Sequence, residues 1–301
     1  MKIFDVIILT EQRYLNPIEK NTYIQNVLDE DALVQNALEN KGLNVERLSW
    51  DDSTFDWETA RIILFRTTWD YFDRFTEFSE WLNAVSKKTI LLNSEKLIRW
   101  NIDKHYLQDL SARGVHVCPS YFVEKGATIS LCELSKKYNL NTFVLKPCVS
   151  GAARHTYKVN DKNVKDISII FDNLIQNEAM ILQPFQPNIV RKGELSLIVI
   201  DGMFSHAVLK KAKAGDFRVQ DDFGGTVEPY TPNQKEIDFA ENAVKACRET
   251  PVYARVDMFL DQTNALALAE LELIEPELWF RHEPLAAERL ATAIHNLIFN
   301  P

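Results

Sequence analysis

Apolar runs of a few residues alternate with amphipathic stretches along the first hundred positions. Each short run is bounded by polar residues, as in a buried strand, and predicts one strand. Between these runs, apolar residues recur at helical spacing, and the first such stretch ends at Gly42, a residue suited to stopping a helix. Strands that alternate with helices predict an α/β unit with a parallel sheet. The predicted strands are 3–9, 44–48, 62–65 and 89–92, and the predicted helices are 29–41 and 75–85.

After Ser94 the pattern changes, because hairpins replace the alternation of strand and helix. Asp201-Gly202 separates two apolar runs, and this dipeptide is typical of a tight hairpin turn. A second hairpin turns through residues 261–264. Antiparallel hairpins after a parallel unit predict at least two domains. The expected strands are 142–146, 180–182, 194–200, 203–209, 252–260 and 265–274, and the expected helices are 104–112 and 284–298.

Charge and composition narrow the classes of partner. The net charge of −9, without any run of Lys or Arg, argues against a nucleic acid bound through its phosphates, although a local basic pocket for a nucleotide is compatible with it. No segment approaches the roughly 20 apolar residues that span a bilayer, and the start of the chain lacks the features of a signal peptide. We interpret the scattered cysteines, which show no zinc-type spacing, as reduced thiols of a cytoplasmic protein. They are Cys118, Cys132, Cys148 and Cys247.

Acidic residues gather on one face of the second predicted hairpin. Pairing Leu260 with Ala265 across the turn sets Asp257 opposite Leu268. Because side chains of a strand alternate between faces, four charged residues then project on one side. They are Arg255, Asp257, Glu270 and Glu272. The opposite face, which is expected to be core, carries Val256, Met258, Ala267, Ala269, Leu271 and Leu273.

Carboxylates beside a guanidinium suit a hard cation next to an anion. Mg²⁺ prefers oxygen ligands, usually one or two carboxylates together with phosphate oxygens and water. The alternation alone fits a solvated sheet face with salt bridges equally well.

Lys146 closes an apolar strand and precedes a loop of small residues. A lysine at the end of such a strand points toward a cleft more often than a surface lysine does. The loop begins at Ser150-Gly151, and its backbone amides could approach phosphates. With a single glycine, the same stretch also fits an ordinary hairpin loop.

A polar and aromatic loop follows the strand 62–65. Ligands of open α/β sheets gather at the carboxyl ends of strands, so this loop is well placed for a substrate. Arg66 could pair with a carboxylate and Asp70 with an ammonium group, while Trp69 and Tyr71 would form apolar walls. This combination suits an amino-acid-like ligand. A structural loop in which Arg66 pairs with Asp70 is the alternative. The candidate substrate residues are Arg66, Thr67, Trp69 and Asp70.

The order of these motifs resembles the ATP-grasp superfamily along nearly the whole chain. The motifs are Lys104, Leu145-Lys146-Pro147 with its loop, Ile181-Leu182-Gln183-Pro184-Phe185, Gly193-Glu194, Lys210, Arg218 and Arg255-x-Asp257…Glu270-x-Glu272. The chain resembles the glutathione-synthetase-like branch and, within it, the ligases of cycloserine biosynthesis, which close O-ureido-D-serine into a ring. The segments that carry this second likeness are 66–71, 193–197, 205–210 and 215–220.

The resemblance implies a fold and a domain division. A substrate domain with a parallel sheet would occupy residues 1–100. Two mixed α+β ATP-grasp subdomains with antiparallel sheets would follow, a lid over 101–185 and a metal-binding and catalytic subdomain over 186–301. Homo-oligomers are common in the superfamily, although no residue of this sequence indicates one.

The resemblance also implies a role for each matching residue. Lys104, Lys146, Ser150 and Gly151 would hold the phosphates of ATP, the backbone around Gln183 and Phe185 would read adenine, and Glu194 would bind the ribose. Asp257, Glu270 and Glu272 would hold Mg²⁺, and Lys210, Arg218 and Arg255 would face the transferred phosphoryl group. Two departures stand out: Glu272 replaces the Asn of many relatives, and the phosphate loop is poor in glycine.

We therefore expect an ATP-dependent carboxylate–nitrogen ligase that activates a small amino-acid-like carboxylate as an acyl phosphate. If the nucleophilic nitrogen belongs to the same molecule, the product is a ring. A glutathione-synthetase-like peptide ligase that joins two substrates is the first alternative. A nucleotide-binding sensor without catalysis is the second, although the complete set of lysines and carboxylates argues against it.

Overall fold

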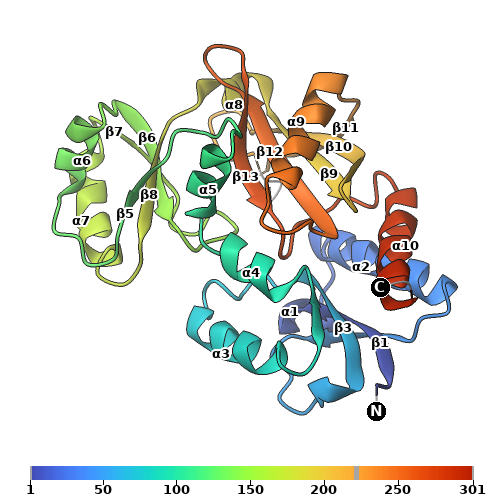
Figure 1. Ribbon diagram of the computed structural model, residues 1–301. Coiled ribbons are helices and arrows are strands. Elements are labelled where there is room, and N and C mark those ends of the chain that lie inside the picture. The colour runs from blue at the N-terminus through green and yellow to red at the C-terminus, as the bar shows by residue number, and fades with distance from the viewer. Residues whose placement is uncertain (1, 220–223, 300–301) are drawn as a thin grey trace.

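A computed structural model describes residues 2–219 and 224–299 (Figure 1). Gln220, the last residue of one motif noted above, lies outside the described residues. The first sheet has the order β2-β1-β3-β4, and each neighbouring pair is parallel, as predicted. Its apolar strands are buried on both faces because helices cover them. The strands are β1 (Phe4–Thr10), β2 (Val45–Ser49), β3 (Ala60–Thr67) and β4 (Ile90–Leu92).

The helices of this first unit include one that begins earlier than its apolar pattern indicates. Helix α2 begins at Thr22 because the side chain of Asn21 accepts a hydrogen bond from the Ile24 amide at 2.8 Å. The predicted helix 29–41 covers only the later part of α2, in which Glu30 and Asp31 occupy buried positions. The helices are α1 (Gln12–Leu15), α2 (Thr22–Asn40), the 3-10 helix η1 (Trp57–Thr59), α3 (Phe75–Val85) and α4 (Glu95–Asn101).

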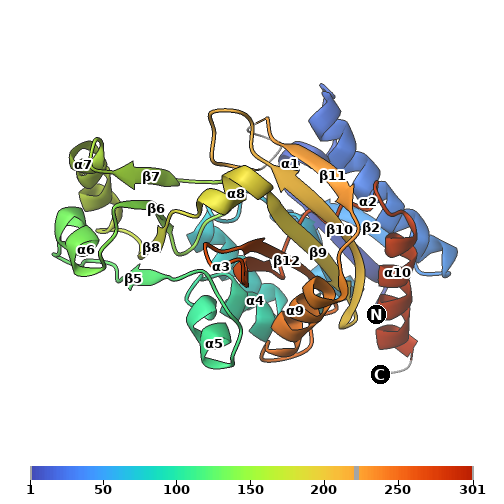
Figure 2. The same cartoon turned by 90° about the horizontal axis from the view of Figure 1, so that it is seen from above.

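A second, antiparallel sheet with the order β5-β8-β6-β7 extends away from the rest of the molecule (Figure 2). Two helices pack on it around a hydrophobic core of its own. One of them, α6, begins with a capping box formed by Ser130 and Glu133. The elements are β5 (Tyr121–Val123), α6 (Leu131–Lys137), β6 (Thr142–Pro147), β7 (Tyr157–Asn160), α7 (Val164–Leu174) and β8 (Met180–Pro184).

The third sheet is antiparallel and has the order β11-β10-β9-β12-β13. The predicted hairpin turn at Asp201-Gly202 is confirmed, since both residues have positive φ, at 50° and 75°. The strands are β9 (Glu194–Ile200), β10 (Met203–Lys211), β11 (Thr226–Tyr230), β12 (Tyr253–Leu260) and β13 (Leu266–Glu272). The helices nearby are α5 (Tyr106–Ala112), α8 (Pro187–Lys192), α9 (Gln234–Lys245) and α10 (Leu285–Phe299).

The register of the β12–β13 hairpin differs from the predicted one. Met258 pairs with Leu268, but Asp257 pairs with Glu270, so Ala269 is the extra residue of a β-bulge. The prediction that Asp257 lies opposite Leu268 is therefore wrong. The pattern of alternating residues cannot reveal a bulge, because the bulge itself shifts the alternation by one position.

The bulge preserves the predicted charged face and changes the opposite one. Asp257 pairs with Glu270 and Arg255 with Glu272, which brings all four charged side chains to one side. Beyond the bulge the residues change faces: Leu268 joins the core, whereas Ala267 packs with Phe259 away from the main core. The expectation that Ala267 and Ala269 are core residues of the opposite face is corrected accordingly.

The first and third sheets share one hydrophobic core, to which α2 and α10 also contribute. In Figure 1 these two helices lie side by side. Tyr253 ties the sheets together: its hydroxyl donates to the Ile274 carbonyl at 2.7 Å, and its own carbonyl accepts from Asn93 at 2.9 Å. Most core residues of the second sheet form a cluster of their own, while Ile181 on β8 and Phe122 on β5 pack with residues of the third sheet. Within the described ranges, no helix has the length and apolar character needed to cross a membrane.

Gly193, which joins α8 to β9, provides a test of this junction. Its φ is +91°, and a Cβ there would lie 2.6 Å from Leu209 Cδ1 and 2.7 Å from the Lys210 carbonyl oxygen. We expect Gly193→Ala to lower the free energy of unfolding by roughly 2 to 4 kcal/mol, because strain and collision add. Urea denaturation measures this loss.

The matched control is Gly126→Ala, where φ is +79° but nothing lies within 4 Å of the added Cβ. This variant should show only the cost of backbone strain. Equal losses in the two variants would contradict the close approach of β9 and β10 at Gly193.

Candidate functional site

A cavity of about 600 Å³ opens where residues of the second and third sheets meet loops and helices of the first unit. It contains every residue predicted to bind nucleotide or metal or to act in catalysis. They are Lys104, Lys146, Ser150, Gly151, Gln183, Phe185, Glu194, Lys210, Arg218, Arg255, Asp257, Glu270 and Glu272. A more open groove of about 970 Å³ beside α9 contains none of them.

Asp257 is the most heavily bonded charge of the cavity. Arg255 donates to it at 2.9 Å and Lys210 at 3.1 Å, and the Ser196 hydroxyl also donates to it. Its exposed fraction is only 3%. Burial by itself would raise the pKa of this carboxyl, but Arg255 and Lys210 outweigh burial and hold the pKa below its usual range. Asp257 is therefore ionised, and it holds two cations in fixed positions.

Lys210 also bonds to Glu194, whose carboxylate lies 2.6 Å from the ammonium group. Burial lowers the pKa of Lys210, but the negative charges of Asp257 and Glu194 raise it overall. The lysine thus stays charged although it is only 3% exposed. In this arrangement Glu194, the predicted ribose ligand, serves as the second partner of Lys210.

Glu270 connects the two predicted phosphate lysines. Lys104 lies 2.9 Å from one carboxylate oxygen and Lys146 lies 3.8 Å from the other. Burial opposes ionisation, yet the two lysines lower the pKa of Glu270 to about 2. The two cations and the carboxylate form a preassembled cluster in which the cations can exchange the carboxylate for phosphate oxygens.

Glu272 pairs with Arg255 and has a different electrostatic character. Its pKa is raised to about 7 because burial and the neighbouring Asp257 outweigh the attraction of Arg255. The carboxylates predicted to bind metal therefore lie on adjacent strands, but their pKa values differ. Those of Asp257 and Glu270 are lowered, whereas that of Glu272 is raised. A positive ion near Glu272 would favour its charged form.

The three carboxylates supply the hard oxygen donors that Mg²⁺ prefers. Among the described residues, however, their oxygen atoms do not converge on one point, because Lys104 and Arg255 lie between them. The donor chemistry thus fits a magnesium ion. Its binding requires the cations to turn toward another anion, and phosphate groups would provide that anion.

The small-residue loop after Lys146 bends over the cavity. Ala152, Ala153 and His155 all adopt positive φ, so the loop reaches left-handed conformations without glycine at those positions. Gly151 allows close approach, since a Cβ there would lie 2.6 Å from the ring of Phe72 in the first unit. Lys104 fixes the loop by donating to the Ser150 carbonyl at 2.7 Å.

At the other end of the cavity, β8 leads into α8. The Phe185 amide donates to the Thr142 carbonyl at 2.9 Å, which occupies one of the backbone groups that was expected to read adenine. Gln183 is 7% exposed and donates to the Ser120 hydroxyl at 2.9 Å. The expectation of backbone recognition by Phe185 is corrected accordingly, while its ring still lines the cavity.

The predicted substrate loop contributes less to the cavity than expected. Arg66 is 1% exposed and lies within 3.8 Å of Glu30 and 3.5 Å of Asp31, so it neither meets the cavity nor pairs with Asp70. Asp70 instead accepts hydrogen bonds from Trp50 and Arg74.

Thr67, the third residue of this set, is also turned inward. Its hydroxyl shares a hydrogen bond of 2.6 Å with Thr10. Of the four candidates, only Trp69 lines the cavity. The correction has a physical cause: Glu30 and Asp31 on α2 supply carboxylates that neutralise Arg66 inside the protein.

Other residues at this end were not predicted as substrate contacts. Arg13, Tyr14 and Tyr23 line the cavity from the segment between β1 and α2, a region with no apolar periodicity that could have pointed to it. Tyr14 packs edge-on against Trp69 at 5.6 Å between ring centroids. Arg13 is the exposed cation of this group and pairs with Glu11.

Glu275, which the sequence indicated only weakly, lies deep at the same end. Trp69 donates to its carbonyl at 2.8 Å, and its carboxyl shares a hydrogen bond with Tyr71. Burial, reinforced by the charge of Glu272, raises the pKa of Glu275 to about 8. The cavity thus has a strongly charged end and an aromatic end with a carboxyl that titrates near neutral pH.

Two stretches of the chain match known families. Residues 6–93 match the N-terminal domain of D-cycloserine synthetase DcsG, and residues 119–258 match the ATP-grasp domain of prokaryotic glutathione synthetase. Over 271 residues the chain is 30% identical to the cycloserine biosynthesis protein DcsG of Streptomyces lavendulae, which covers 84% of this chain and 88% of that protein.

Solved structures agree with these matches. The crystal structure of D-cycloserine synthetase DcsG has a TM-score of 0.85 at 27% identity and covers 97% of this chain and 99% of that one. D-alanine–D-alanine ligase from Bacillus anthracis complexed with ATP shares the fold, with a TM-score of 0.64 at 13% identity over 98% and 97% of the two chains. The expected fold class, a parallel α/β unit followed by antiparallel sheets, is confirmed.

The buried position of Arg66 predicts a stability effect. In Arg66→Met, Glu30 and Asp31 each lose one guanidinium partner while the volume is largely kept, and they retain Arg281 and Arg47 respectively. We expect a loss of about 3 kcal/mol in the free energy of unfolding, measured by urea denaturation. The control is Arg61→Met on the same strand, whose half-exposed pair with Asp5 should cost less than about 1 kcal/mol. A stable Arg66 variant with impaired substrate binding would instead return Arg66 to the substrate site.

The raised pKa of Glu275 predicts that the stability of the folded protein changes with pH in a definite direction. Because its pKa in the folded protein is raised to about 8, the stability it contributes is complete below pH 4.5 and is lost as the pH rises through 8. Glu275→Gln removes this titration, so the variant should match the parent at pH 5 and exceed it by on the order of 2 kcal/mol at pH 8.5.

Urea denaturation at the two pH values measures the difference, and Glu58→Gln, an exposed residue, is the control. If the Glu275 variant follows the parent at both pH values, the raised pKa is refuted.

Proposed function

The chain belongs to the ATP-grasp family of ATP-dependent ligases, and we propose that it activates a small amino-acid-like carboxylate as an acyl phosphate and joins it to a nitrogen. The observation that carries this proposal is the composition of one cavity. Buried cations paired with carboxylates occupy one end, and aromatic side chains beside Glu275 occupy the other.

The charged end suits the polyphosphate of ATP. Lys104 and Lys146 would exchange Glu270 for phosphate oxygens, and the loop that begins at Ser150 and Gly151 would cover them. Compact ammonium groups in a buried site stabilise spread negative charge without reorganising during the reaction. Gln183, Phe185 and Glu194 would bound the nucleoside.

Mg²⁺, when bound, would supply positive charge that neutralises part of the charge of the phosphates. Asp257, Glu270 and Glu272 would hold it once the cations turn to the phosphates. The low pKa of Glu270 keeps this ligand ionised throughout the physiological range.

The reaction would proceed in two steps. A substrate carboxylate oxygen attacks the γ-phosphorus, the bond to the β-phosphate oxygen breaks, and ADP leaves. The nitrogen then attacks the activated carbonyl, a carbon–nitrogen bond forms, and phosphate leaves with the electron pair of the carbon–oxygen bond. Lys210, Arg218 and Arg255 would stabilise the developing negative charge. Glu275, at the aromatic end, could take the proton lost by the nitrogen when it is ionised, a form that becomes common only as the pH rises toward 8.

The aromatic end suits a small zwitterion. Trp69 and Tyr14 would form its walls, and Arg13 would take over the carboxylate role first expected of Arg66. The names of the relatives refer to cycloserine synthesis, which favours a substrate whose own nitrogen closes the ring.

Mg²⁺-dependent ADP release tests the proposal. The chain is incubated with ATP and a panel of amino acids, dipeptides and O-ureidoserine, and products are followed by mass. We expect ADP with one amine-bearing carboxylate and a product lighter than that substrate by one water. Glu270→Gln should lower kcat at least roughly 100-fold while leaving the unfolding transition intact, because an uncharged amide cannot replace the carboxylate at the cations and metal.

The control variant is Glu133→Gln, which lies in a capping box remote from the cavity and should retain activity. ADP release that requires two substrates would replace ring closure with intermolecular ligation of the glutathione-synthetase type. Tight MgATP binding without any turnover across the panel would overturn the enzymatic proposal in favour of a nucleotide sensor.

A further inference from the structure

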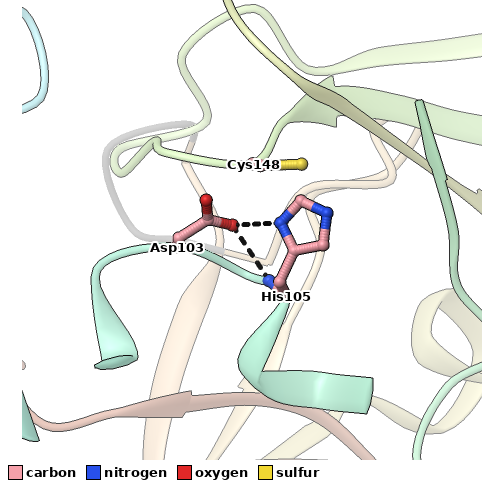
Figure 3. A group of neighbouring side chains, drawn as sticks. All are labelled: Asp103, His105 and Cys148. Carbon is pink, nitrogen blue, oxygen red and sulfur yellow. Dashed lines mark hydrogen bonds and ion pairs between the residues drawn. The ribbon is translucent and has the colours of Figure 1, made fainter. Parts of the chain in front are cut away.

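Outside the cavity, the fold brings two neighbouring side chains, Asp103 and His105, together with Cys148 from a distant part of the sequence (Figure 3). Asp103 and His105 lie in the link between α4 and α5, and Cys148 follows β6. A carboxylate oxygen, an imidazole nitrogen and the thiol sulfur all lie within 4.8 Å of one another. The sequence showed no zinc-type spacing, because the ligand atoms come from segments that meet only in the fold.

The imidazole of His105 is held on both of its nitrogens. Nδ1 lies 2.6 Å from Asp103 Oδ1, and Nε2 lies 3.2 Å from Glu124 Oε1. The ring also stacks on Phe122 at 4.2 Å between centroids. A histidine that binds a metal through one nitrogen typically donates its other N–H to a carboxylate, which fixes the ring and its tautomer. Glu124 is placed for that second role.

The donor set selects a class of metal. Sulfur, imidazole nitrogen and one carboxylate oxygen suit Zn²⁺ and similar divalent transition metals, whereas Mg²⁺ prefers oxygen alone. Asp103 and His105 are partly exposed, with side-chain exposures of 41% and 31%, which gives an ion access from solvent. Cys148, by contrast, is 1% exposed and lies on the inner side of the cluster.

We propose that Asp103, His105 Nδ1 and Cys148 Sγ bind a divalent transition metal of the Zn²⁺ class, with Glu124 holding the Nε2–H of the imidazole. Metal binding forms a metal–sulfur bond and releases the thiol proton to solvent, and the proton that Nδ1 shares with Asp103 moves to Nε2 of the ring or to solvent. The imidazole turns Nδ1 from Asp103 to the metal, and Asp103 follows as an oxygen ligand.

The position of this site links it to the nucleotide cavity without placing it inside. None of the three ligands lines the cavity, but Lys104 and Ser150 beside them do. The Lys104 amide donates to the Cys148 carbonyl at 3.0 Å, and its ammonium group donates to the Ser150 carbonyl. A metal bound here would therefore connect the link that carries Lys104 with the start of the phosphate loop. Its role would be structural rather than catalytic.

Cobalt(II) is the probe that separates this site from the carboxylates of the cavity. Added to the full-length protein in excess Mg²⁺, it should produce a sulfur-to-cobalt charge-transfer absorption that saturates at one equivalent, and Zn²⁺ should abolish the absorption by displacement. Carboxylates alone cannot produce this band. Cys148→Ser should remove it, and His105→Gln should weaken binding at least 10-fold.

Cys132→Ser is the matched control, because that partly buried cysteine lies near Ser168 on α7 and should leave the band unchanged. Zn²⁺ should also raise the Tm of the parent and of Cys132→Ser, but not that of Cys148→Ser. Absence of a thiolate band in the folded parent, or a band that persists in Cys148→Ser, would overturn the proposal. Should Cys148→Ser fail to fold, His105→Gln alone decides, since an unchanged affinity in that variant also refutes the site.

Discussion

The inner face of the third sheet depends on the mutual neutralisation of buried charges. Asp257 lies between Arg255 and Lys210, and the hydroxyl of Ser196 on β9 also donates to it. In a low-dielectric interior an unpaired ion is costly, so each cation keeps its place only because a carboxylate faces it. These ion pairs connect β9, β10 and β12 and hold the cations in place in the absence of a ligand. In the proposed function, a bound nucleotide would exchange its phosphates for the carboxylates that now pair with these cations.

A second constraint is the division of the hydrophobic interior. The first and third sheets share a core that includes α2 and α10, whereas the second sheet has its own. The cavity lies between the first unit, the second sheet and the third sheet, and a Cβ at Gly151 would lie 2.6 Å from the ring of Phe72 in the first unit. The proposed metal site of Asp103, His105 and Cys148 lies where the chain passes from one body to the other. Polar and charged side chains are thus concentrated at the boundary between the two cores, where fewer groups take part in core packing.

Much of the fold was predictable because local patterns decide it. Buried strands alternate with amphipathic helices up to α3, and an Asp-Gly turn produces the β9–β10 hairpin. That the predicted lysines and carboxylates share one cavity was also predictable, since residues at strand ends form motifs that can be recognised in the sequence. The substrate side was not. Arg66 follows a strand as a ligand would, yet two carboxylates on a helix more than thirty residues away bury it.

The sequence by itself therefore determined many of the strands and helices, the parallel and antiparallel character of the first and third sheets, and the charged residues that line one cavity. These features follow from periodicity and from motifs whose chemistry is local. Only the tertiary structure decided the bulge at Ala269, the neutralisation of Arg66 by α2, the raised pKa of Glu275 and the meeting of Cys148 with His105. Each of these depends on which distant groups share a low-dielectric interior. Burial and long-range pairing are properties of the folded chain, and no local pattern encodes them.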